Sequence, residues 1–466
     1  MVTSTNGLPR RLAFCLLGAL LAVVAVGSVQ AEGLAQAGGS TQTAADAVVG
    51  PSESIQEAVN AADPGDTIVV KGVHREDVVI RKDGIKLRGE DAAIEAPPKA
   101  KADSPCSKEF GPEGICVLGD VDLQTGKVSR YVKNVSLSGF KISGFKDAGI
   151  AVAGARDATV TKIRAMNNWD GISTGLSVGT KILSNAVRGS GNDGVVLEDS
   201  RAVTIAKNYV EGTSNGAAIV VRRGTNATVV NNDLTGNLYG TSVFDSTGTT
   251  ILSNEVSRSE FAGAVDIDSP GTRILSNEVS RSGFIGALVL GQKSQDAKVV
   301  GNNISGGPFG IYVEDAHEGS FVGNDLRDNC AGMFFEAFKG EPVGGFTLSG
   351  NTVADNTRSC RAAQFDRNFS GIGIALLGAS GMKVTANHFW GNVPTGPTPV
   401  SGGVVVSKDP YFQDTNFGGT QKPNNNSVVA NHFGRNKPDI FWDESGSGNR
   451  FVGNLCNSSV PSRLCN

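Results

Sequence analysis

The sequence of 466 residues is poor in aromatic, histidine and methionine side chains, and it has no large excess of charge of either sign. Phe, Trp and Tyr together make up 6 % of it, and there are 4 His and 4 Met. The formal net charge is −4, from 42 Lys and Arg against 46 Asp and Glu. The chain therefore lacks the excess of positive charge that attracts a nucleic acid, and we expect no nucleic acid partner.

Proline is sparse as well, at 17 residues, whereas glycine is abundant at 61 of 466, close to twice its usual share of about 7 %. The glycines follow no Gly-X-Y period, which excludes collagen. An apolar fraction of 39 % with 19 % charged residues is too ordinary for a disordered chain. The glycine excess therefore indicates an architectural repeat.

Long hydrophobic runs are absent after the first thirty residues. Arg10 and Arg11 precede an apolar stretch over 12–26, and small residues follow at Val29-Gln30-Ala31. This pattern predicts a cleaved signal peptide over 1–31, because a membrane anchor needs about 20 apolar residues. It does not distinguish Sec from twin-arginine export. We expect no membrane span after cleavage, and a secreted or cell-envelope location.

Two further boundaries follow from composition. Residues 32–50 are rich in Ala, Gly, Gln and Thr and are predicted to be a flexible linker. Residues 51–466 are predicted to form one domain, although length alone would suggest about three. The oligomeric state is not predicted.

Cysteines in the exported chain are few and fall in three sequential pairs. We predict structural disulfides between neighbours, because an exported chain meets an oxidising compartment. A metal site is the alternative, but no Cys-x-x-Cys motif occurs. The six residues are Cys106, Cys116, Cys330, Cys360, Cys456 and Cys465.

One short sequence motif recurs along the chain: an apolar residue, two or three variable residues, Asn, any residue, and a second apolar residue. Eight intervals from position 140 to position 324 give 23 residues per unit, and such a period indicates a repeat architecture. The Asn markers are Asn185, Asn208, Asn232, Asn254, Asn277, Asn302, Asn324, Asn351, Asn387, Asn431 and Asn454.

Each unit contains two or three short β-rich runs and no amphipathic helix, which predicts an all-β fold: a single-domain parallel β-helix of about 13–15 coils. At the same bend of successive coils, the Asn side chains are expected to form a hydrogen-bonded ladder. Glycines after each marker, such as Gly171, Gly194, Gly240, Gly310 and Gly332, are attributed to an unusual φ and to a closely stacked backbone.

The beginning of the domain predicts a short capping helix. Ser54-Ile55-Gln56-Glu57 is a capping-box pattern, and Asp63-Pro64-Gly65-Asp66 ends the helix. The stretches 54–71 and 78–89 resemble the opening of secreted right-handed parallel β-helix proteins. These form the pectin lyase-like superfamily, which includes pectate lyases, polygalacturonases, alginate epimerases and NosD-type proteins. The resemblance, with the repeat, covers residues 54–466.

The catalytic motifs of those families are incomplete in this chain. Asn168-Trp169-Asp170 is similar to the Asn-Thr-Asp of polygalacturonases, but their Gly-His-Gly and Arg-Ile-Lys motifs are absent. Asp409-Pro410-Tyr411 is similar to the Asp-Pro-His of alginate epimerases but lacks the His. The resemblance therefore implies the fold and transfers no active site.

Alignment of the coils places charged residues in columns on the strand that follows the Asn bend. Asp266 and Glu314 are the candidate catalytic carboxylates, about 10 Å apart, and Arg222 is a candidate base. Such columns could also hold Ca²⁺ beside a uronate. The alternative is a solvated sheet face with alternating charges. The first column is Glu198, Arg222, Phe244, Asp266, Val289, Glu314 and Glu336, and the second is Asp199, Arg223, Asp245, Asp268 and Asp315.

Long intervals near the C-terminus predict loop insertions at about 355–375 and 393–426, which could form a substrate site. Substrate-binding candidates from the columns and these insertions together are Glu198, Asp245, Asp268, Glu336, Phe365, Tyr411 and Phe412. His388 and His432 follow the ladder Asn in neighbouring coils and are expected to stack. We favour a structural role for them over metal binding, because no third ligand is evident.

These observations favour a secreted β-helix protein that binds a polysaccharide, acidic or neutral, and they leave open whether it also cleaves or epimerises the polymer. The alternative is a non-catalytic binding or scaffold protein of the cell envelope. A NosD-like role in the maturation of a metal enzyme is disfavoured by the scarcity of His and Met. The sequence leaves open whether the protein is an enzyme and which glycan it recognises.

Overall fold

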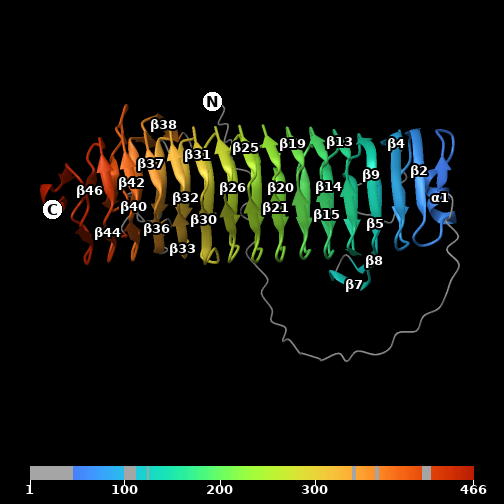
Figure 1. Cartoon of the computed structure of the whole chain (residues 1–466), viewed down its shortest axis with the longest axis horizontal. Coiled ribbons are helices and arrows are strands. Elements are labelled where there is room, and N and C mark those ends of the chain that lie inside the picture. Colours follow the sequence, from blue (N-terminus) through green and yellow to red (C-terminus); the bar gives the residue numbers. More distant parts are fainter. Residues whose placement is uncertain are drawn as a thin grey trace, which may run out of the picture. The chain divides into compact units, whose positions relative to one another are not determined.

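The computed structural model describes residues 46–98, 112–122, 125–337, 343–362, 367–411 and 421–465. This part of the chain is an all-β solenoid of about 17 turns with one short α-helix near its N-terminal end (Figure 1). The fold is the one that the sequence predicts. The number of turns is slightly higher than expected, because the first turns lack the Asn marker from which the coils were counted.

One sheet of the solenoid contains 15 parallel strands, each from a different coil. Its strands, in spatial order, are β3 (Val78–Ile80), β5 (Ile115–Leu118), β10 (Ala148–Ala153), β14 (Asp170–Gly175), β17 (Val195–Glu198), β20 (Ala217–Arg222), β23 (Tyr239–Phe244), β26 (Ala262–Ile267), β29 (Ile285–Leu290), β32 (Phe309–Glu314), β35 (Ala331–Glu336), β40 (Ile372–Leu377), β43 (Gly402–Ser407), β46 (Ile440–Trp442) and β48 (Ser459–Val460).

A second sheet contains 27 strands, and most coils contribute two short strands that flank the Asn bend. They are β1 (Ala47–Val49), β2 (Thr67–His74), β4 (Lys86–Glu95), β9 (Ser136–Ser143), β12 (Thr159–Thr161), β13 (Arg164–Met166), β15 (Lys181–Leu183), β16 (Ala186–Arg188), β18 (Thr204–Ala206), β19 (Tyr209–Glu211), β21 (Thr228–Val230), β22 (Asp233–Thr235), β24 (Thr250–Leu252), β25 (Glu255–Ser257), β27 (Arg273–Leu275), β28 (Glu278–Ser280), β30 (Ala297–Val300), β31 (Asn303–Ser305), β33 (His317–Val322), β34 (Asp325–Arg327), β36 (Gly344–Ser349), β37 (Thr352–Ala354), β41 (Lys383–Thr385), β42 (His388–Trp390), β44 (Ser427–Val429), β45 (His432–Gly434) and β47 (Arg450–Val452).

Three two-stranded sheets lie outside the two large ones. They are formed by β6 (Asp120–Asp122) with β7 (Lys127–Arg130), by β8 (Val132–Lys133) with β11 (Ala155–Arg156), and by β38 (Ser359–Ala362) with β39 (Arg367–Ser370). The last pair is an antiparallel hairpin inside the first predicted insertion. A 3₁₀ turn, η3 (Ser462–Leu464), follows the last strand.

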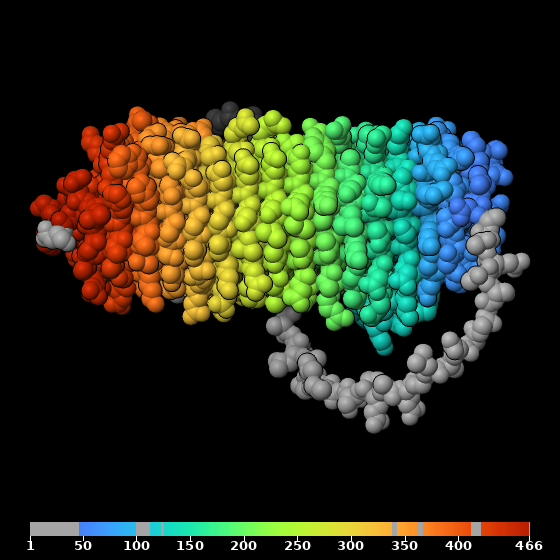
Figure 2. Space-filling view, viewed as in Figure 1, coloured from blue at the N-terminus to red at the C-terminus, as the bar shows by residue number. Residues whose placement is uncertain are grey.

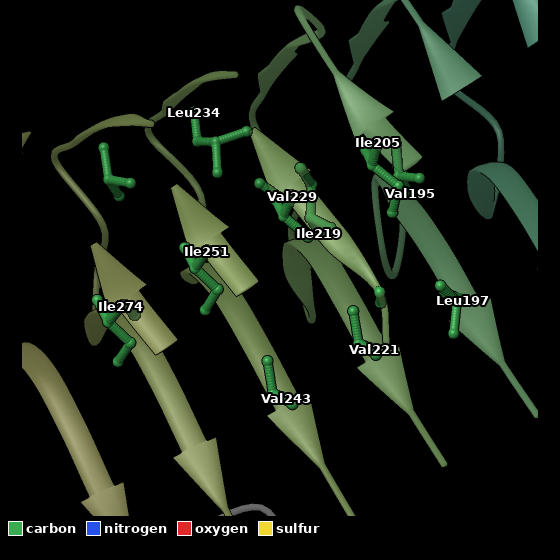
Figure 3. Close-up of a cluster of buried hydrophobic side chains, with 14 of the residues drawn as sticks. Val195, Leu197, Ile205, Ile219, Val221, Val229, Leu234, Val243, Ile251 and Ile274 are labelled. Carbon is green, nitrogen blue, oxygen red and sulfur yellow. The ribbon is translucent and has the colours of Figure 1, made fainter. Parts of the chain in front are cut away.

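The interior of the solenoid is filled by aliphatic side chains from both large sheets. Val195 and Leu197 of the 15-stranded sheet point toward the interior, as do Ile205 and Val229 of the 27-stranded sheet (Figure 3). All four are buried. Each coil adds one such layer, so neighbouring coils are held together by packing as well as by strand pairing. Seen from outside, the coils follow one another in sequence order along the solenoid (Figure 2).

The predicted Asn ladder is present. From Asn185 onward, the side-chain amide of each marker donates to the side-chain oxygen of the next, for example 3.0 Å from Asn185 to Asn208 and 3.1 Å from Asn431 to Asn454. The same amide also donates to a backbone oxygen of the preceding coil. Because these side chains are buried, the ladder satisfies polar groups at every bend.

The glycines after the markers have a single cause rather than the two that were expected. None of Gly171, Gly194, Gly240, Gly310 and Gly332 has a positive φ, so the expectation of an unusual backbone angle is wrong for them. The close approach is real. A Cβ on Gly240 would lie 2.3 Å from the backbone oxygen of Gly263 and 2.4 Å from Cγ1 of Val256.

The N-terminal end of the solenoid is covered by α1 (Ile55–Ala61), as predicted. Ser54 is its N-cap, with its hydroxyl accepting from the Glu57 amide at 3.3 Å. Ile55 and Val59 are buried against the first coil. The predicted linker ends earlier than expected, because Ala47–Val49 form β1 and pair with β2. The predicted signal peptide lies outside the described residues, as does the rest of the linker before residue 46.

Two of the predicted disulfides are present, Cys330–Cys360 and Cys456–Cys465. Cys116 is disulfide-bonded, and Cys106 lies outside the described residues. Within the described ranges, no helix has the length and apolar character that crossing a membrane would require.

Candidate functional site

The outward-facing side chains of the 15-stranded sheet form columns, because successive strands pair in register. In the column that contains Glu198 and Arg222, strand pairing gives Phe244, Ile267, Leu290, Glu314 and Glu336 in order. Glu314 and Glu336 are therefore direct neighbours. The predicted column was correct in five of its seven members.

The placement of Asp266 in this column is wrong by one residue. Asp266 pairs with Val243 and Val289, whose side chains are in the interior core, and it is fully buried. A one-residue slip turns a side chain to the other face of a sheet. Burial raises the pKa of Asp266 to about 7. The structure does not bring Asp266 to Glu314, so these two carboxyls form no catalytic pair.

The second predicted column lies at the corner where the strand ends. Asp199, Arg223, Asp245, Asp268 and Asp315 all have φ between 46° and 52°. Asp tolerates this left-handed conformation better than most residues, so the corner itself accounts for the residue type. Asp245 and Asp268 are thus corner residues beside the column rather than members of a separate acidic strip.

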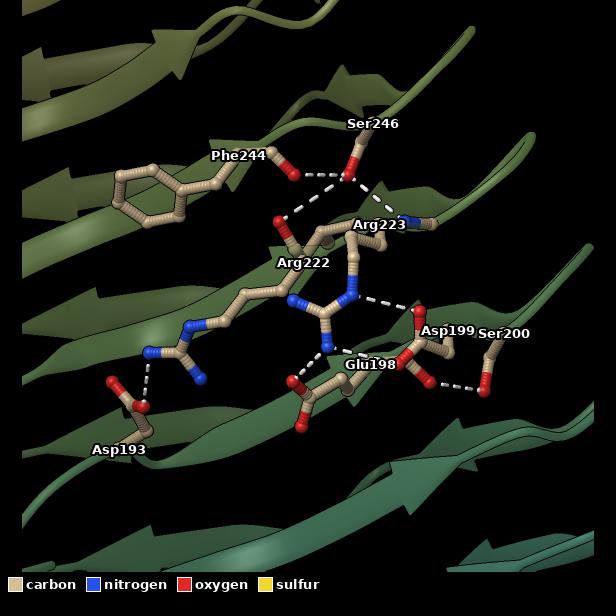
Figure 4. Close-up of polar contacts among 10 residues, drawn as sticks. Asp193, Glu198, Asp199, Ser200, Arg222, Arg223, Phe244 and Ser246 are labelled. Carbon is tan, nitrogen blue, oxygen red and sulfur yellow. Dashed lines mark hydrogen bonds and ion pairs between the residues drawn. The ribbon is translucent and has the colours of Figure 1, made fainter. Parts of the chain in front are cut away.

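Charged residues of neighbouring coils pair in the N-terminal part of this sheet face (Figure 4). The Arg223 guanidinium forms ion pairs with Glu198 and with Asp199, the latter at 2.8 Å. Arg222, the candidate base, donates from Nη2 to Oδ2 of Asp193 at 2.9 Å. Asp193 also accepts from the Ala217 amide at 2.7 Å. The Arg222 guanidinium is therefore held in place by its ion pair with Asp193.

A row of four carboxyls lies at or just before the start of β5, β10, β14 and β17 in successive coils, and we call it the acidic row. Its members are Glu113, Asp147, Asp170 and Asp193. Burial raises the pKa of Glu113 to about 8 and that of Asp147 to about 6, with repulsion from the next carboxylate adding to both. The pKa of Asp170 is also raised, mainly by burial, although its Oδ1 accepts from the Asp193 amide at 2.9 Å.

An aromatic ring stands beside the acidic row. Trp169 immediately precedes Asp170 and is 42 % exposed. A Cβ on Gly191, in the next coil, would lie 2.9 Å from the Trp169 ring, so the ring rests against that glycine. An exposed indole next to carboxyls and an arginine is an arrangement that suits a sugar ring and its hydroxyls.

Sequence reasoning missed Asp147, Asp170 and Asp193 as a group. The available signal was the repeated Asp before a strand, in Asn168-Trp169-Asp170-Gly171 and in Asn192-Asp193-Gly194. The coils were aligned on the end of the strand, so the beginning of the strand was not compared between coils.

The C-terminal part of the same sheet face is covered. The hairpin β38–β39 and the segment around 393–411 pack on it and form a second apolar cluster, separate from the interior core. Phe309 lies near its centre, with ring centroids 4.8 Å from Phe369 and 5.1 Å from Phe334. The predicted Cys330–Cys360 disulfide joins β38 to the residue just before β35 and so braces the hairpin against the sheet.

Two buried carboxyls lie beneath this cover. Tyr312 donates its hydroxyl to Glu336, which is 1 % exposed. Burial, and then the neighbouring Asp409 carboxyl, raises the pKa of Glu336 well above its usual range. Tyr411 is 1 % exposed, its hydroxyl lies 3.3 Å from Thr398 Oγ1, and its ring stacks on Phe369 at 4.5 Å. Glu336 and Tyr411 are therefore inaccessible to a polymer in this conformation.

The remaining predicted site residues fall in different places. Glu314 is half-buried, next to Glu336 in the column. Phe365 and Phe412 lie outside the described residues. His388 and His432 are neighbours, with ring centroids 5.0 Å apart, but the rings meet edge to face at an interplanar angle of 78°, so the predicted stacking is wrong. Among the described residues, no three or more His, Cys, Asp or Glu side chains are grouped so as to hold a metal ion, so the acidic columns do not converge on a Ca²⁺ site there.

Comparisons with known proteins agree with the fold. Residues 60–268 match the family described as periplasmic copper-binding protein (NosD), and residues 237–409 match the right-handed β-helix region. No curated protein matches the chain in sequence. The two disulfides fit an extracytoplasmic location.

The solved structures that match the chain are distant from it in sequence. The mannuronan C-5 epimerase AlgE4 A-module of Azotobacter vinelandii is 13 % identical, with 87 % of this chain and 92 % of that chain covered and a TM-score of 0.44. The DFA-IIIase of Arthrobacter chlorophenolicus without its lid is 13 % identical, with 68 % and 94 % covered and a TM-score of 0.45.

The catalytic unit of the GH87 α-1,3-glucanase from Streptomyces thermodiastaticus is also 13 % identical, with 90 % of this chain and 70 % of that chain covered and a TM-score of 0.46. At this level of identity the likeness concerns the fold alone. The strand order, the stacked coils and the two family matches together identify the chain as a right-handed β-helix protein.

Proposed function

We propose that the protein binds a neutral polysaccharide along the open, N-terminal part of the outer face of the 15-stranded sheet. The observation that carries the proposal is the exposed Trp169 beside the partly buried Asp170, with Arg222, two coils further on, held in place by the buried Asp193. The indole would stack on a sugar ring, and the polar groups would bond to its hydroxyls. A polyanion is disfavoured because it would meet the four carboxyls of the acidic row.

The regular stacking of the coils supports an extended ligand. Neighbouring strands are about 4.8 Å apart, so the same kind of group recurs along the solenoid at a short, constant spacing. A linear polymer that lies along the axis would contact several coils at once, and many weak contacts would add to a useful affinity.

Binding can be tested by affinity electrophoresis in gels that contain a neutral glucan, a fructan, pectate or alginate. We expect retardation by at least one neutral polymer and weaker retardation in the double variant Trp169→Ala/Arg222→Gln, by about tenfold or more in affinity. Glu278→Gln, an exposed carboxylate on the other sheet, is the matched control and should bind as the wild type does. Equal binding by the double variant, or binding to no polymer in a broad panel, would refute the proposal.

Hydrolysis of the bound polymer is a second candidate, favoured by the different environments of adjacent carboxyls in the acidic row. Asp193 is ion-paired with Arg222, whereas burial favours the protonated form of Asp170. Two adjacent carboxyls in different surroundings are the arrangement that glycosidases use for their acid and base roles. Release of reducing ends that Asp170→Asn abolishes, with binding retained, would support hydrolysis. Binding without release would leave the protein a non-catalytic scaffold.

A further inference from the structure

A pocket of about 370 Å³ lies on the outer face of the other, 27-stranded sheet, and the function proposed above does not use it. Its lining comes from three successive coils: Arg327 of β34, Thr352 and Ala354 of β37, and His388 and Trp390 of β42. Arg327, Ala354 and Trp390 occupy one register column. Strands are about 4.8 Å apart, so the small Ala354 leaves a notch between two large side chains roughly 10 Å apart at the backbone.

The wall formed by Trp390 is fixed in place before any ligand binds. The indole lies over Gly434 of the next coil, where an added Cβ would come within 2.1 Å of the ring. The Arg435 guanidinium lies 5.2 Å from the ring centroid, and the His388 ring is stacked at 5.9 Å with an interplanar angle of 7°. A rigid, half-buried aromatic wall costs little ordering entropy on binding.

Several N–H groups that line the pocket are available to donate hydrogen bonds to a ligand. Arg327 pairs through Nε with Asp325 at 2.6 Å. Within the described ranges, no residue forms a hydrogen bond to its terminal nitrogens, to the His388 ring or to the Trp390 indole nitrogen. Partial burial lowers the pKa of His388, and the positive charges of His432 and Arg327 lower it further. An anion bound in the pocket would accept hydrogen bonds from these N–H groups. Its negative charge would raise the pKa of His388 again.

We propose that this pocket binds a single sugar ring that carries one anionic group, either a carboxylate or a phosphate. The apolar face of the ring would lie against Trp390 in the notch above Ala354, and the anionic group would bond to Arg327 and His388. A simple anion would make no use of the aromatic wall, and a neutral sugar would leave the guanidinium donors unmatched.

Isothermal titration calorimetry of the exported chain tests the proposal with D-glucuronate, D-glucose 6-phosphate, D-glucose and inorganic phosphate as probes. We expect at least one of the two anionic sugars to bind, and D-glucose and inorganic phosphate to bind at least tenfold more weakly. The two anionic sugars distinguish a carboxylate from a phosphate. Ala354→Leu fills the notch without removing a polar group and should weaken binding at least tenfold.

Two further variants complete the test. Arg327→Gln should weaken the anionic sugar by about tenfold or more, since it removes a charge-assisted hydrogen bond. Ser280→Leu lies in the same column, outside the pocket, and should change nothing. The proposal is overturned if no anionic sugar binds, if D-glucose or inorganic phosphate binds equally well, or if Ala354→Leu binds like the wild type. Because the pocket lies on a different sheet, these outcomes are independent of polysaccharide binding near Trp169.

Discussion

Glu198 and Glu336 occupy the same column of the 15-stranded sheet, yet their surroundings are opposite. The Glu198 side chain is 44 % exposed and pairs with Arg223, whereas Glu336 is 1 % exposed and bonds to Tyr312 beneath a cover of inserted loops. The same position of the repeated coil thus holds an exposed, ion-paired carboxylate in one coil and a buried carboxyl in another. The insertions, rather than the repeat, decide which part of the face a polymer can reach.

Removal of an aromatic ring should give the largest difference in stability between the covered and the open part of the sheet face. Phe309→Ala in the covered part removes a ring that is 1 % exposed and should lower the free energy of unfolding by about 3–5 kcal/mol. Phe244→Ala in the open part removes a half-buried ring and should cost about 1–2 kcal/mol. Urea denaturation of both variants measures the difference. Equal losses would show that the cover adds no packing.

A smaller effect should come from the disulfide that braces the cover. Cys330→Ala/Cys360→Ala opens a link with a sequence separation of 30 and should lower the free energy of unfolding by roughly 3 kcal/mol. Hydrogen exchange should rise in residues 330–411 and stay unchanged around Trp169. Faster exchange along the whole solenoid would contradict a local role. The double variant Cys456→Ala/Cys465→Ala, at the other bridge, is the control.

The smallest effect concerns pH. Glu336 has a raised pKa in the folded state, so its contribution to stability is full below the ordinary Glu pKa of about 4.5. That contribution is lost as the pH rises toward the folded pKa, because the unfolded chain ionises first. Glu336→Gln should therefore flatten the fall of stability between pH 5 and pH 8, measured by thermal unfolding. Glu198→Gln, at the exposed ion pair with Arg223, should change the free energy of unfolding by no more than about 1 kcal/mol.

Much of the fold could be predicted from local signals that repeat. The spacing of the Asn markers predicts a hydrogen-bonded ladder, because it places a side-chain amide at the same bend of successive coils. The observed bonds run from Asn185 to Asn454. The capping helix follows from Ser54 and its apolar stripe. The pairing of Cys330 with Cys360 was predicted because the cysteines fall in sequential pairs along the chain.

The site was predicted only in part, for two physical reasons. Side chains alternate between faces with a period of two, so an error of one residue placed the buried Asp266 on the surface. The burial of Glu336 and Tyr411 depends on loops that fold back over several coils, and no local pattern describes that packing. Arg222 and Glu198 were placed correctly because their strands continue the repeat without insertion.

The central claim is that the open part of the outer face, and not the covered part, takes the glycan. Hydrogen–deuterium exchange of the exported chain with and without a retarding polymer tests it most directly. We predict protection confined to the segments 145–151, 168–175, 190–198 and 217–223, and its loss in Trp169→Ala/Arg222→Gln. Protection of 309–336 or 367–411 instead, with none around Trp169, would contradict the account.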